Sequence, residues 1–368
     1  MTPELREVLA RYGIGPAAQS RPQGGGHVNA SYRIVDRANS GSEFLLQRLN
    51  PSVFRDGGAV MRNFARVTTH LERAIAEAGL SSPERRVLRL VPTLTGEIGV
   101  VAPDGAWWRL LQYIPGTQMI EHVEDPTQAR EIGAAFGLFQ RLTASYAGPP
   151  LEVTIPDFHD TPNRLATFEE TVRRNPVGRA AAVWSEIAFI LARRGLADLL
   201  ASAAGRVPLR VVHNDAKPSN VLLDAETGAG LAVVDLDTVM PGTVLHDIGD
   251  LIRSSSCSAP EDETDLSLVR VDPTLFLALA SGFLSGSGPG LLNEVERELF
   301  VAAGLVITFE QGIRFLTDHL AGDTYYRITR PGQNLDRARV QLQLLASLES
   351  MRSDMERTLR DLTHSLWS

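Results

Sequence analysis

Two short apolar segments in the middle of the chain each end in a group of polar side chains. The first, VVHNDAKPSNVLLD, covers residues 211–224, and the second, LAVVDLDTVMPG, covers residues 231–242. Both have the pattern of buried strands that deliver polar residues where they end. The chain is therefore constrained to a fold in which two strand ends bring carboxylates and an amide to one place.

Such a set of side chains suits the transfer of a phosphoryl group. That chemistry consists mostly of positioning the reactants and neutralising charge. One carboxylate must accept the hydroxyl proton of the acceptor, and hard oxygen ligands must hold magnesium between phosphates. The candidates are His213, Asp215 and Asn220 at the first strand end, and Asp235 and Asp237 at the second.

The chain contains 36 basic residues, and all but one of them are arginine. The single lysine, Lys217, lies within the first polar segment. Because no Gly-Lys-Ser or Gly-Lys-Thr tripeptide exists, the sequence excludes a Walker A phosphate loop, and a Schiff-base lysine could only be Lys217. The one lysine that remains suggests a position where a compact charge cannot be replaced by a planar guanidinium.

Net charge and cysteine content exclude several classes of protein. The formal net charge is -8 and the isoelectric point is about 5.6, which leaves no basic field for coating nucleic acid. One cysteine, Cys257, rules out an internal disulfide framework and a site with several thiolate ligands. The sequence predicts neither a membrane span nor a signal peptide, because no run approaches about 18 apolar residues and charges interrupt the opening segment. We expect a cytoplasmic protein, monomeric or homodimeric, with no nucleic-acid or membrane partner.

The order of predicted elements divides the chain into two parts. Strand patterns dominate up to residue 113, with one amphipathic helix over 57–79, and helical periodicity dominates afterwards. We expect an α+β fold with a small antiparallel-sheet lobe over residues 1–113 and a larger, mostly helical lobe over 114–368. The helical patterns cover residues 126–143, 163–173, 179–203, 273–286, 291–320 and 334–364, whereas composition favours a loop over 281–290.

The first polar segment resembles the catalytic loop of the protein-kinase-like fold. In that loop an Asp follows a His by two residues and an Asn follows the Asp by five, as do His213, Asp215 and Asn220. Protein kinases also have a Phe-Gly after the second Asp and an Ala-Pro-Glu segment, and this chain has neither. It is more similar to the aminoglycoside phosphotransferase and choline kinase family, which phosphorylates small molecules. The resemblance implies a bilobal protein-kinase-like fold.

Within that family the chain looks most like the N-acetylhexosamine 1-kinases. The similarity extends over the segments HNDAKPSNVLLD, VVDLDTVMPGTVLHDIGDLIR, GGGHVNASYRI, LLQRLNPSVFRDGGAVMRN, IPDFHDTPNRL and FEQGIRFLTDHLAGDTYYRI. Those enzymes phosphorylate the anomeric hydroxyl of N-acetylglucosamine and N-acetylgalactosamine. The resemblance therefore implies a kinase that uses ATP and Mg²⁺ to make a sugar 1-phosphate.

The resemblance also implies roles for the residues of the two polar segments. Asp215 matches the catalytic base, and Asn220 and Asp235 match the two magnesium ligands. Lys217 matches the lysine that protein kinases place against the transferring phosphate. We expect the ring of His213 to hold the loop by hydrogen bonds.

Three further aspartates near these segments have less specific patterns. Asp237 is interpreted either as a carboxylate behind the metal ligands or as a solvated turn residue. Asp247 and Asp250 are predicted to cap and anchor the helix that follows.

The resemblance implies a nucleotide site between the lobes. The glycine turn in GGGHVNASYRIVD precedes a strand, not a helix, which excludes a dinucleotide fingerprint and implies a cover for the phosphates. Gln47 occupies the strand position where protein kinases have a lysine, so nucleotide affinity would depend more on magnesium. The residues implied are Gly25, Gly26, His27, Asn29 and Gln47 for the phosphates, and Gln112, Tyr113 and Ile114 for the adenine edge.

For the sugar, the resemblance implies Arg314 and Tyr325, together with His159 and Asp160 of the FHD sequence. Without the resemblance, the four-residue spacing around Arg314 favours a solvated helix face with surface ion pairs.

Two alternatives stay open. One keeps the fold but changes the acceptor to an aminoglycoside, a choline-like amine or a homoserine-like alcohol, and an amine acceptor would need several carboxylates facing the pocket. The other is a nucleotide-binding scaffold with a degenerate site. Gln47 in place of a lysine favours the scaffold, and the intact set of Asp215, Asn220 and Asp235 argues against it.

Overall fold

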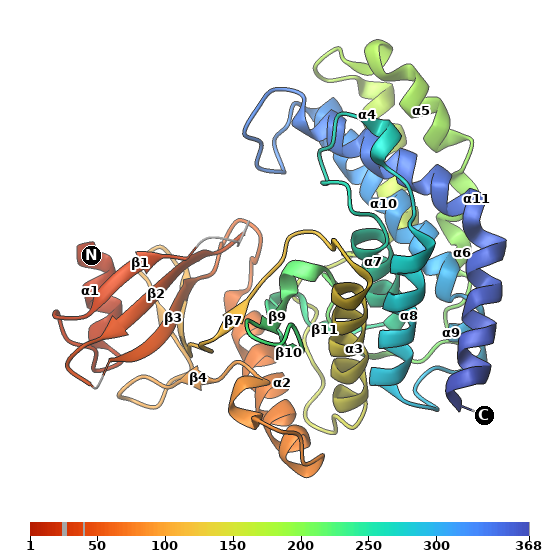
Figure 1. Cartoon of the computed structure of the whole chain (residues 1–368). Helices are drawn as coiled ribbons and strands as arrows, with labels where there is room; N and C mark the ends of the chain where they lie inside the picture. Colours follow the sequence, from red (N-terminus) through yellow and green to blue (C-terminus); the bar gives the residue numbers. More distant parts are fainter. Residues whose placement is uncertain (24–27, 40, 368) are drawn as a thin grey trace.

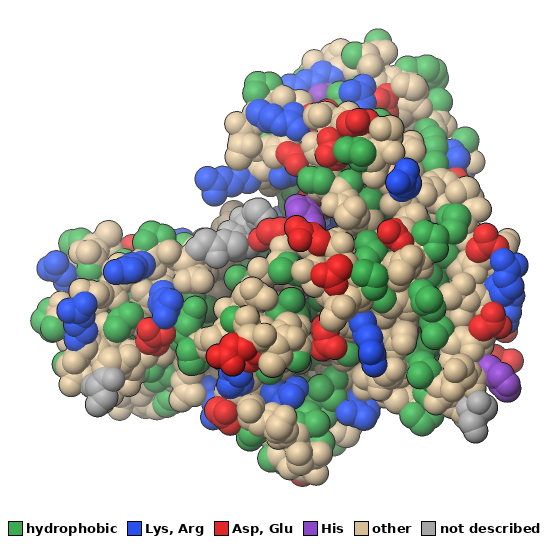
Figure 2. Space-filling model, in the orientation of Figure 1, with side chains coloured by type: hydrophobic (Ala, Val, Ile, Leu, Met, Phe, Trp, Pro, Cys, Tyr) green, Lys and Arg blue, Asp and Glu red, His purple; other side chains and the backbone are tan. Residues whose placement is uncertain are grey.

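The computed structural model describes residues 1–23, 28–39 and 41–367. The chain forms a small lobe built on one sheet and a larger lobe dominated by helices, and the two lie side by side (Figure 1). On the face shown in Figure 2, the surface is hollowed where the lobes meet. The bilobal α+β architecture expected from the order of predicted elements is confirmed.

The small lobe contains two helices and an antiparallel sheet in the strand order β1-β2-β3-β6-β4, with β5 paired to β6. Gln47 lies directly opposite Arg109 in the register of β3 and β6. The elements of this lobe are α1 (Pro3–Ala10), β1 (Gln19–Pro22), β2 (Ala30–Asp36), β3 (Ser42–Arg48), α2 (Gly57–Glu77), β4 (Leu90–Val91), β5 (Val100–Val101) and β6 (Trp107–Gln112).

The helical lobe carries two small sheets, one of β7, β9 and β10 and the other of β8 and β11. Strand β7 pairs with β9 immediately after β6 has ended, which supports our proposed lobe boundary at residue 113. The elements are β7 (Thr117–Gln118), α3 (Pro126–Thr143), α4 (Thr161–Arg174), α5 (Trp184–Leu191), α6 (Asp198–Ala201), β8 (Arg210–Val212), β9 (Val221–Asp224), β10 (Gly230–Val233), β11 (Met240–Gly242), α7 (Val244–Ser255), α8 (Pro273–Ser287), α9 (Glu294–Glu298), α10 (Phe300–Ala321) and α11 (Gln333–Trp367).

Helix α2 connects the two lobes. Asp56 caps it by accepting the Ala59 N–H at 2.9 Å, and its apolar face, including Phe64, is buried. Asn63 on this helix is also buried. Its side-chain nitrogen donates to the carbonyls of Glu152 (2.7 Å) and Val239 (3.0 Å), and its oxygen accepts the N–H of Glu152 at 2.9 Å. One side chain of the small lobe thus binds three backbone groups of the helical lobe.

Helices α3 and α8 pack backbone against backbone through glycines on both helices. A Cβ atom on Gly137 would lie 2.2 Å from the carbonyl oxygen of Phe283, and one on Gly286 would lie 2.3 Å from that of Ala134. The loop expected over residues 281–290 is therefore wrong for its first part, because α8 continues to Ser287. Its glycines provide close approach between helices, which composition alone does not distinguish from loop flexibility.

The helix expected over 179–203 is broken into short pieces, and the break at Arg194–Leu196 contains a glycine, which disfavours a continuous helix. Helix α10 is long and apolar enough to cross a membrane by length and composition, but 83% of that stretch is buried inside the fold. This is the character of a core helix.

Candidate active site

Strand β8 leads into the loop over residues 213–220, and the side chain of His213 fixes this loop by two hydrogen bonds. The ring is fully buried, and its Nδ1 atom accepts the N–H of Asp215 at 3.3 Å. Its Nε2 atom, which then carries the ring proton, donates to the carbonyl of Val234 at 2.8 Å. The expectation that His213 holds the loop is confirmed, and it connects the ends of β8 and β10.

Asp247 on α7 braces the same loop from the other side. Its two oxygens accept the backbone N–H groups of His213 (2.9 Å) and Asn214 (2.7 Å), and Gln140 adds a third hydrogen bond at 2.6 Å. The prediction that Asp247 caps the following helix is wrong, because Thr243 supplies that cap. Burial of the Asp247 side chain raises its pKa, while these donors favour the charged form.

Asp215, Lys217 and Asn220 meet at the tip of this loop. The Lys217 Nζ atom lies 2.8 Å from Asp215 Oδ2, and the Asn220 side-chain nitrogen donates to the same oxygen at 3.0 Å. Burial raises the pKa of Asp215, but the charge and hydrogen bond of Lys217, together with the other neighbours that include Asn220, lower it overall. Asp215 is therefore a carboxylate at neutral pH, and it is held by two neighbours that the sequence places within five residues.

Asp235 follows β10 and lies beside this group. The N–H of Val234 donates to the carbonyl of Asn220 at 2.9 Å, so the two proposed metal ligands are on adjacent backbone. Burial, and the nearby charges of Asp237 and Asp215, raise the pKa of Asp235. An amide oxygen and a carboxylate are donors that Mg²⁺ accepts, and a cation here would relieve the repulsion between the carboxylates. The residues present therefore fit the metal.

Of the residues expected at the nucleotide phosphates, Gly25, Gly26 and His27 lie outside the described residues. Asn29 is described, and its side-chain nitrogen donates to Asp237 Oδ2 at 2.6 Å while its oxygen accepts the N–H of Asn50 at 3.0 Å. Asn29 thus connects the segment that leads into β2 to the loop that follows Asp235.

The proposed adenine edge is partly engaged within the protein. The backbone N–H of Gln112 donates to the carbonyl of Arg89 at 2.9 Å, and that of Tyr113 donates to the carbonyl of Glu43 at 3.2 Å. The side chain of Ile114 is buried in the main core. Neither of the two N–H groups is directed at a ligand, so an adenine contact here would use other backbone atoms.

Gln47 has a partner that the sequence analysis missed. Its side-chain oxygen accepts two hydrogen bonds from Arg109, at 3.0 and 2.8 Å, and Arg109 also forms an ion pair with Asp237. Asp237 is therefore a buried residue behind Asp235, and its interpretation as a solvated turn is wrong. The sequence signal for Arg109 was an arginine within the apolar strand WWRLLQ.

Arg314 lies in an aromatic setting on α10. Its guanidinium carbon is 5.4 Å from the centre of the Phe158 ring and 5.6 Å from that of Tyr326. Tyr325, which is 65% exposed, packs edge-on against Tyr326. Burial lowers the pKa of Arg314, but Tyr326 and other neighbours raise it overall. The loop that carries Tyr325 follows α10. Asp318 fixes this loop by accepting the backbone N–H groups of residues 324, 325 and 326.

His159 and Asp160 have partners within the protein. The two ring nitrogens of His159 lie 2.9 Å from Glu310 Oε1 and 2.9 Å from the carbonyl of Asn214, and the side chains of His159 and Glu310 are 5% and 1% exposed. Because both neighbours can only accept, the ring carries two protons. Burial lowers the pKa of His159, but Glu310 and other neighbours raise it overall. Burial raises the pKa of Glu310, but the His159 imidazolium, Arg314 and Thr161 lower it to about 2. Asp160 caps α4.

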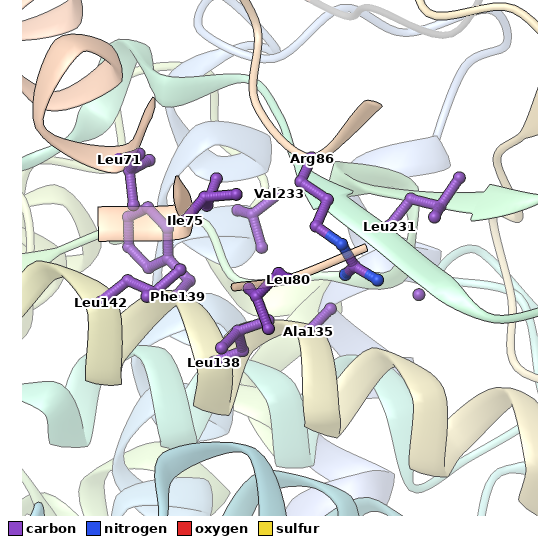
Figure 3. Close-up of a pocket in the computed structure, with 11 residues that line it drawn as sticks. Leu71, Ile75, Leu80, Arg86, Ala135, Leu138, Phe139, Leu142, Leu231 and Val233 are labelled. Carbon is purple, nitrogen blue, oxygen red and sulfur yellow. The ribbon is translucent and has the colours of Figure 1, made fainter. Parts of the chain in front are cut away.

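One cavity lies beside His159 and Asp160, and a second, smaller one is lined by none of the candidate site residues. The larger, of about 410 Å³, is lined by Phe158, His159, Asp160, Asn214 and His246 among others, and its described lining does not include Asp215. The smaller lies between α2, α3 and β10 and is shown in Figure 3. Its side chains are nearly all apolar, with Arg86 as the charged exception. Neither cavity by itself defines the reaction centre.

The chain has the bilobal protein-kinase-like architecture. A family model described as "Phosphotransferase enzyme family" matches residues 20–273, and the chain belongs to this family.

Solved structures of similar fold cover almost the whole chain. An aminoglycoside phosphotransferase from Alicyclobacillus acidocaldarius superposes with a TM-score of 0.61 at 16% identity, covering 97% of each chain. A microcompartment-associated aminopropanol kinase gives 0.60 at 15% identity, covering 96% of this chain and 98% of its own. An amicoumacin kinase in complex with AMP-PNP and Ca²⁺ gives 0.60 at 13% identity, covering 96% of this chain and 92% of its own. At these identities the likeness shows the fold alone.

Proposed function

We propose that this phosphotransferase uses ATP to phosphorylate the anomeric C1 hydroxyl of an N-acetylhexosamine. The observation that carries the proposal is the meeting of Asp215, Lys217 and Asn220 beside Asp235 at two strand ends. The family supports phosphoryl transfer, and the similar fold bound to AMP-PNP and Ca²⁺ supports a nucleotide with a divalent cation. The sugar acceptor rests on the sequence resemblance and on the setting of Arg314.

In this mechanism Asp215 accepts a hydrogen bond from the sugar hydroxyl and orients its oxygen toward the terminal phosphorus. The new oxygen–phosphorus bond forms as the bond to the ADP oxygen breaks, and the hydroxyl proton passes to the Asp215 carboxylate. Lys217 neutralises charge on the moving phosphoryl group. Because the pKa of Asp215 is low, it acts first by orienting the hydroxyl and takes the proton late.

Asn220 and Asp235 would hold the magnesium ion. When bound, Mg²⁺ neutralises negative charge on the phosphates. The backbone hydrogen bond between Val234 and Asn220 keeps these two ligands in register. His213 and Asp247 fix the loop that carries Asp215, so the base and the metal ligands share one rigid support.

The surroundings of Arg314 favour a neutral sugar over a cationic amine. The Arg314 guanidinium can donate hydrogen bonds to sugar oxygens and would repel a cationic amine, which would also need free carboxylates. Glu261, whose charge acts on Tyr326 beside Arg314, is already engaged with Arg253. This supports the N-acetylhexosamine over an aminoglycoside or choline-like acceptor.

The proposal is tested by ADP formation in a coupled assay with N-acetylglucosamine, N-acetylgalactosamine, glucosamine, galactose, choline and kanamycin at equal concentration. We expect the two N-acetylhexosamines to be preferred. A preference for choline or kanamycin would show that the acceptor is an amine and that the proposed sugar acceptor is wrong. Tight ATP binding without ADP formation from any acceptor would favour the nucleotide-binding scaffold.

The role of Asp215 has its own test. We expect Asp215→Asn to lower kcat by about 10²–10⁴-fold while ATP binding is nearly unchanged, since the carboxylate acts on the acceptor hydroxyl. The matched control is Asp198→Asn, an exposed carboxylate in the same lobe. Near wild-type turnover in Asp215→Asn would reject the assignment of the base.

A further inference from the structure

The small lobe has a buried positive charge, Arg109, on β6, the strand next to the β3 position where protein kinases have a lysine. Gln47 on β3 stands where protein kinases have a lysine, and Arg48 points to the other face, where it pairs with Asp104. Arg109 lies directly opposite Gln47 on β6, so both side chains share one face of the sheet. The guanidinium of Arg109 therefore supplies a positive charge beside Gln47, the position that has a lysine in protein kinases.

Arg109 is held by three separate elements. It donates two hydrogen bonds to Gln47 of β3, and its guanidinium carbon lies 4.2 Å from the centre of the Phe64 ring of α2. Its ion pair with Asp237 crosses to the helical lobe, and the two side chains are only 1% and 2% exposed. A charge pair this deeply buried is costly to break, because either partner alone would remain as an uncompensated charge.

Asp237 joins this pair to the loop that follows β10. Its second carboxylate oxygen accepts the 2.6 Å hydrogen bond from Asn29. Asp237 lies in the short helical turn Leu236–Thr238, whose preceding residue is Asp235. We call Arg109, Gln47, Asp237 and Asn29 the Arg109 network. It connects the strand that carries Gln47 and the segment after the glycine turn to the proposed metal-binding loop.

The backbone of this turn needs such support. Asp235 has a φ of 59°, in the left-handed region, which costs a residue other than glycine of the order of 1 kcal/mol or more and persists only where neighbours hold it. Within the helical lobe, Thr238 donates its hydroxyl to the carbonyl of His213 at 2.7 Å. From the small lobe, the turn is held by Arg109 through Asp237. The carboxylate of Asp235 is therefore oriented from both lobes.

We propose that Arg109 is a positioning residue for the phosphoryl-transfer site. It acts through Asp237 to hold the turn that presents Asp235 to the metal, and it couples this turn to the small lobe. In protein kinases a lysine on a strand of the small lobe pairs with a glutamate and contacts the phosphates. Here the pairing is made by Arg109 with a carboxylate of the metal-binding loop. The proposal rests on the proposed function, because it takes Asp235 as a metal ligand.

The test measures how strongly nucleotide binding depends on Mg²⁺. AMP-PNP is titrated into the full chain by calorimetry, with Mg²⁺ and with EDTA, for the wild type and for Arg109→Lys. Lysine keeps the charge but cannot make the three directed hydrogen bonds of the guanidinium. We expect Arg109→Lys to weaken binding with Mg²⁺ by about 10–100-fold, the usual effect of losing a residue behind a metal ligand, and to leave binding in EDTA unchanged.

Two further variants separate positioning from general stability. Arg193→Lys is the matched control, because Arg193 also combines a carboxylate partner, Glu349, with an aromatic ring, Phe189, and the expected change in binding is none. In Arg109→Lys/Asp237→Glu the longer acid reaches the shorter base, and we expect part of the Mg²⁺-dependent affinity to return.

A failure to fold does not leave the proposal untested. If Arg109→Lys does not fold, Arg109→Met/Asp237→Leu removes both charges together, which is tolerated far better than a single deletion, and the same loss with Mg²⁺ is expected.

The outcomes separate this proposal from the proposed function. If the wild type binds AMP-PNP with Mg²⁺ and Arg109→Lys binds it equally well, the positioning role is wrong and the proposed function stands. The same conclusion follows if Arg109→Lys lowers only the unfolding temperature. A wild type that binds no nucleotide under either condition overturns both.

Discussion

Asn63 offers a direct measurement of how firmly the lobes are joined. Its buried side chain makes three hydrogen bonds to backbone groups of Glu152 and Val239 in the helical lobe. Asn63→Leu replaces the amide with an apolar group of similar size and leaves those three groups without their partner. At about 1 kcal/mol for each hydrogen bond, we expect the free energy of unfolding to fall by about 3 kcal/mol.

The assay is urea unfolding followed by circular dichroism, with the loss calculated from the shift in midpoint and the slope. The control is Arg73→Ala, an exposed position on the same helix, for which a change within about 0.5 kcal/mol is expected. A loss below about 1 kcal/mol in Asn63→Leu would show that these hydrogen bonds do not join the lobes as argued.

Three further predictions follow from the geometry. The pKa of His159 is raised above its unfolded value of 6.5, so the ion pair of His159 stabilises the fold fully below pH 6.5 and this stabilisation is lost as the pH rises through the folded pKa. His159→Gln should remove this pH dependence, measured by urea unfolding at several pH values. Gly137→Leu should destabilise the chain by about 3 kcal/mol or more by forcing α3 from α8, whereas Gly195→Ala, where a Cβ meets open space, should change the melting temperature little. Lys217→Arg should lower kcat in the ADP assay although charge is kept, because the planar guanidinium cannot take the place of the ammonium beside Asp215; an unchanged kcat would refute this.

The parts of the fold set by local patterns could be predicted from the sequence. The helices over 57–79 and 126–143 have clear apolar periodicity and are confirmed within two residues at each end. The segment over 281–290 could not be predicted correctly, since Gly282 and Gly286 make contacts with a helix about 150 positions earlier in the chain. That distance is invisible to any local pattern.

The candidate site divides in the same way. Asp215, Lys217 and Asn220 lie within six consecutive positions, so one loop brings them together and the motif is legible in the sequence. Asp247 and Arg109 reach the site from α7 and from β6. Their roles depend on which strands and helices become neighbours, and a lone arginine or aspartate carries no sign of that.

Arg109 and Asn63 each make one of their contacts with the short stretch from Asp237 to Val239. A rotation of one lobe against the other that kept these two contacts would displace this stretch least. Points farther from it along the small lobe sweep the largest arc. Such a rotation would leave Asp235, two residues before Asp237, nearly stationary.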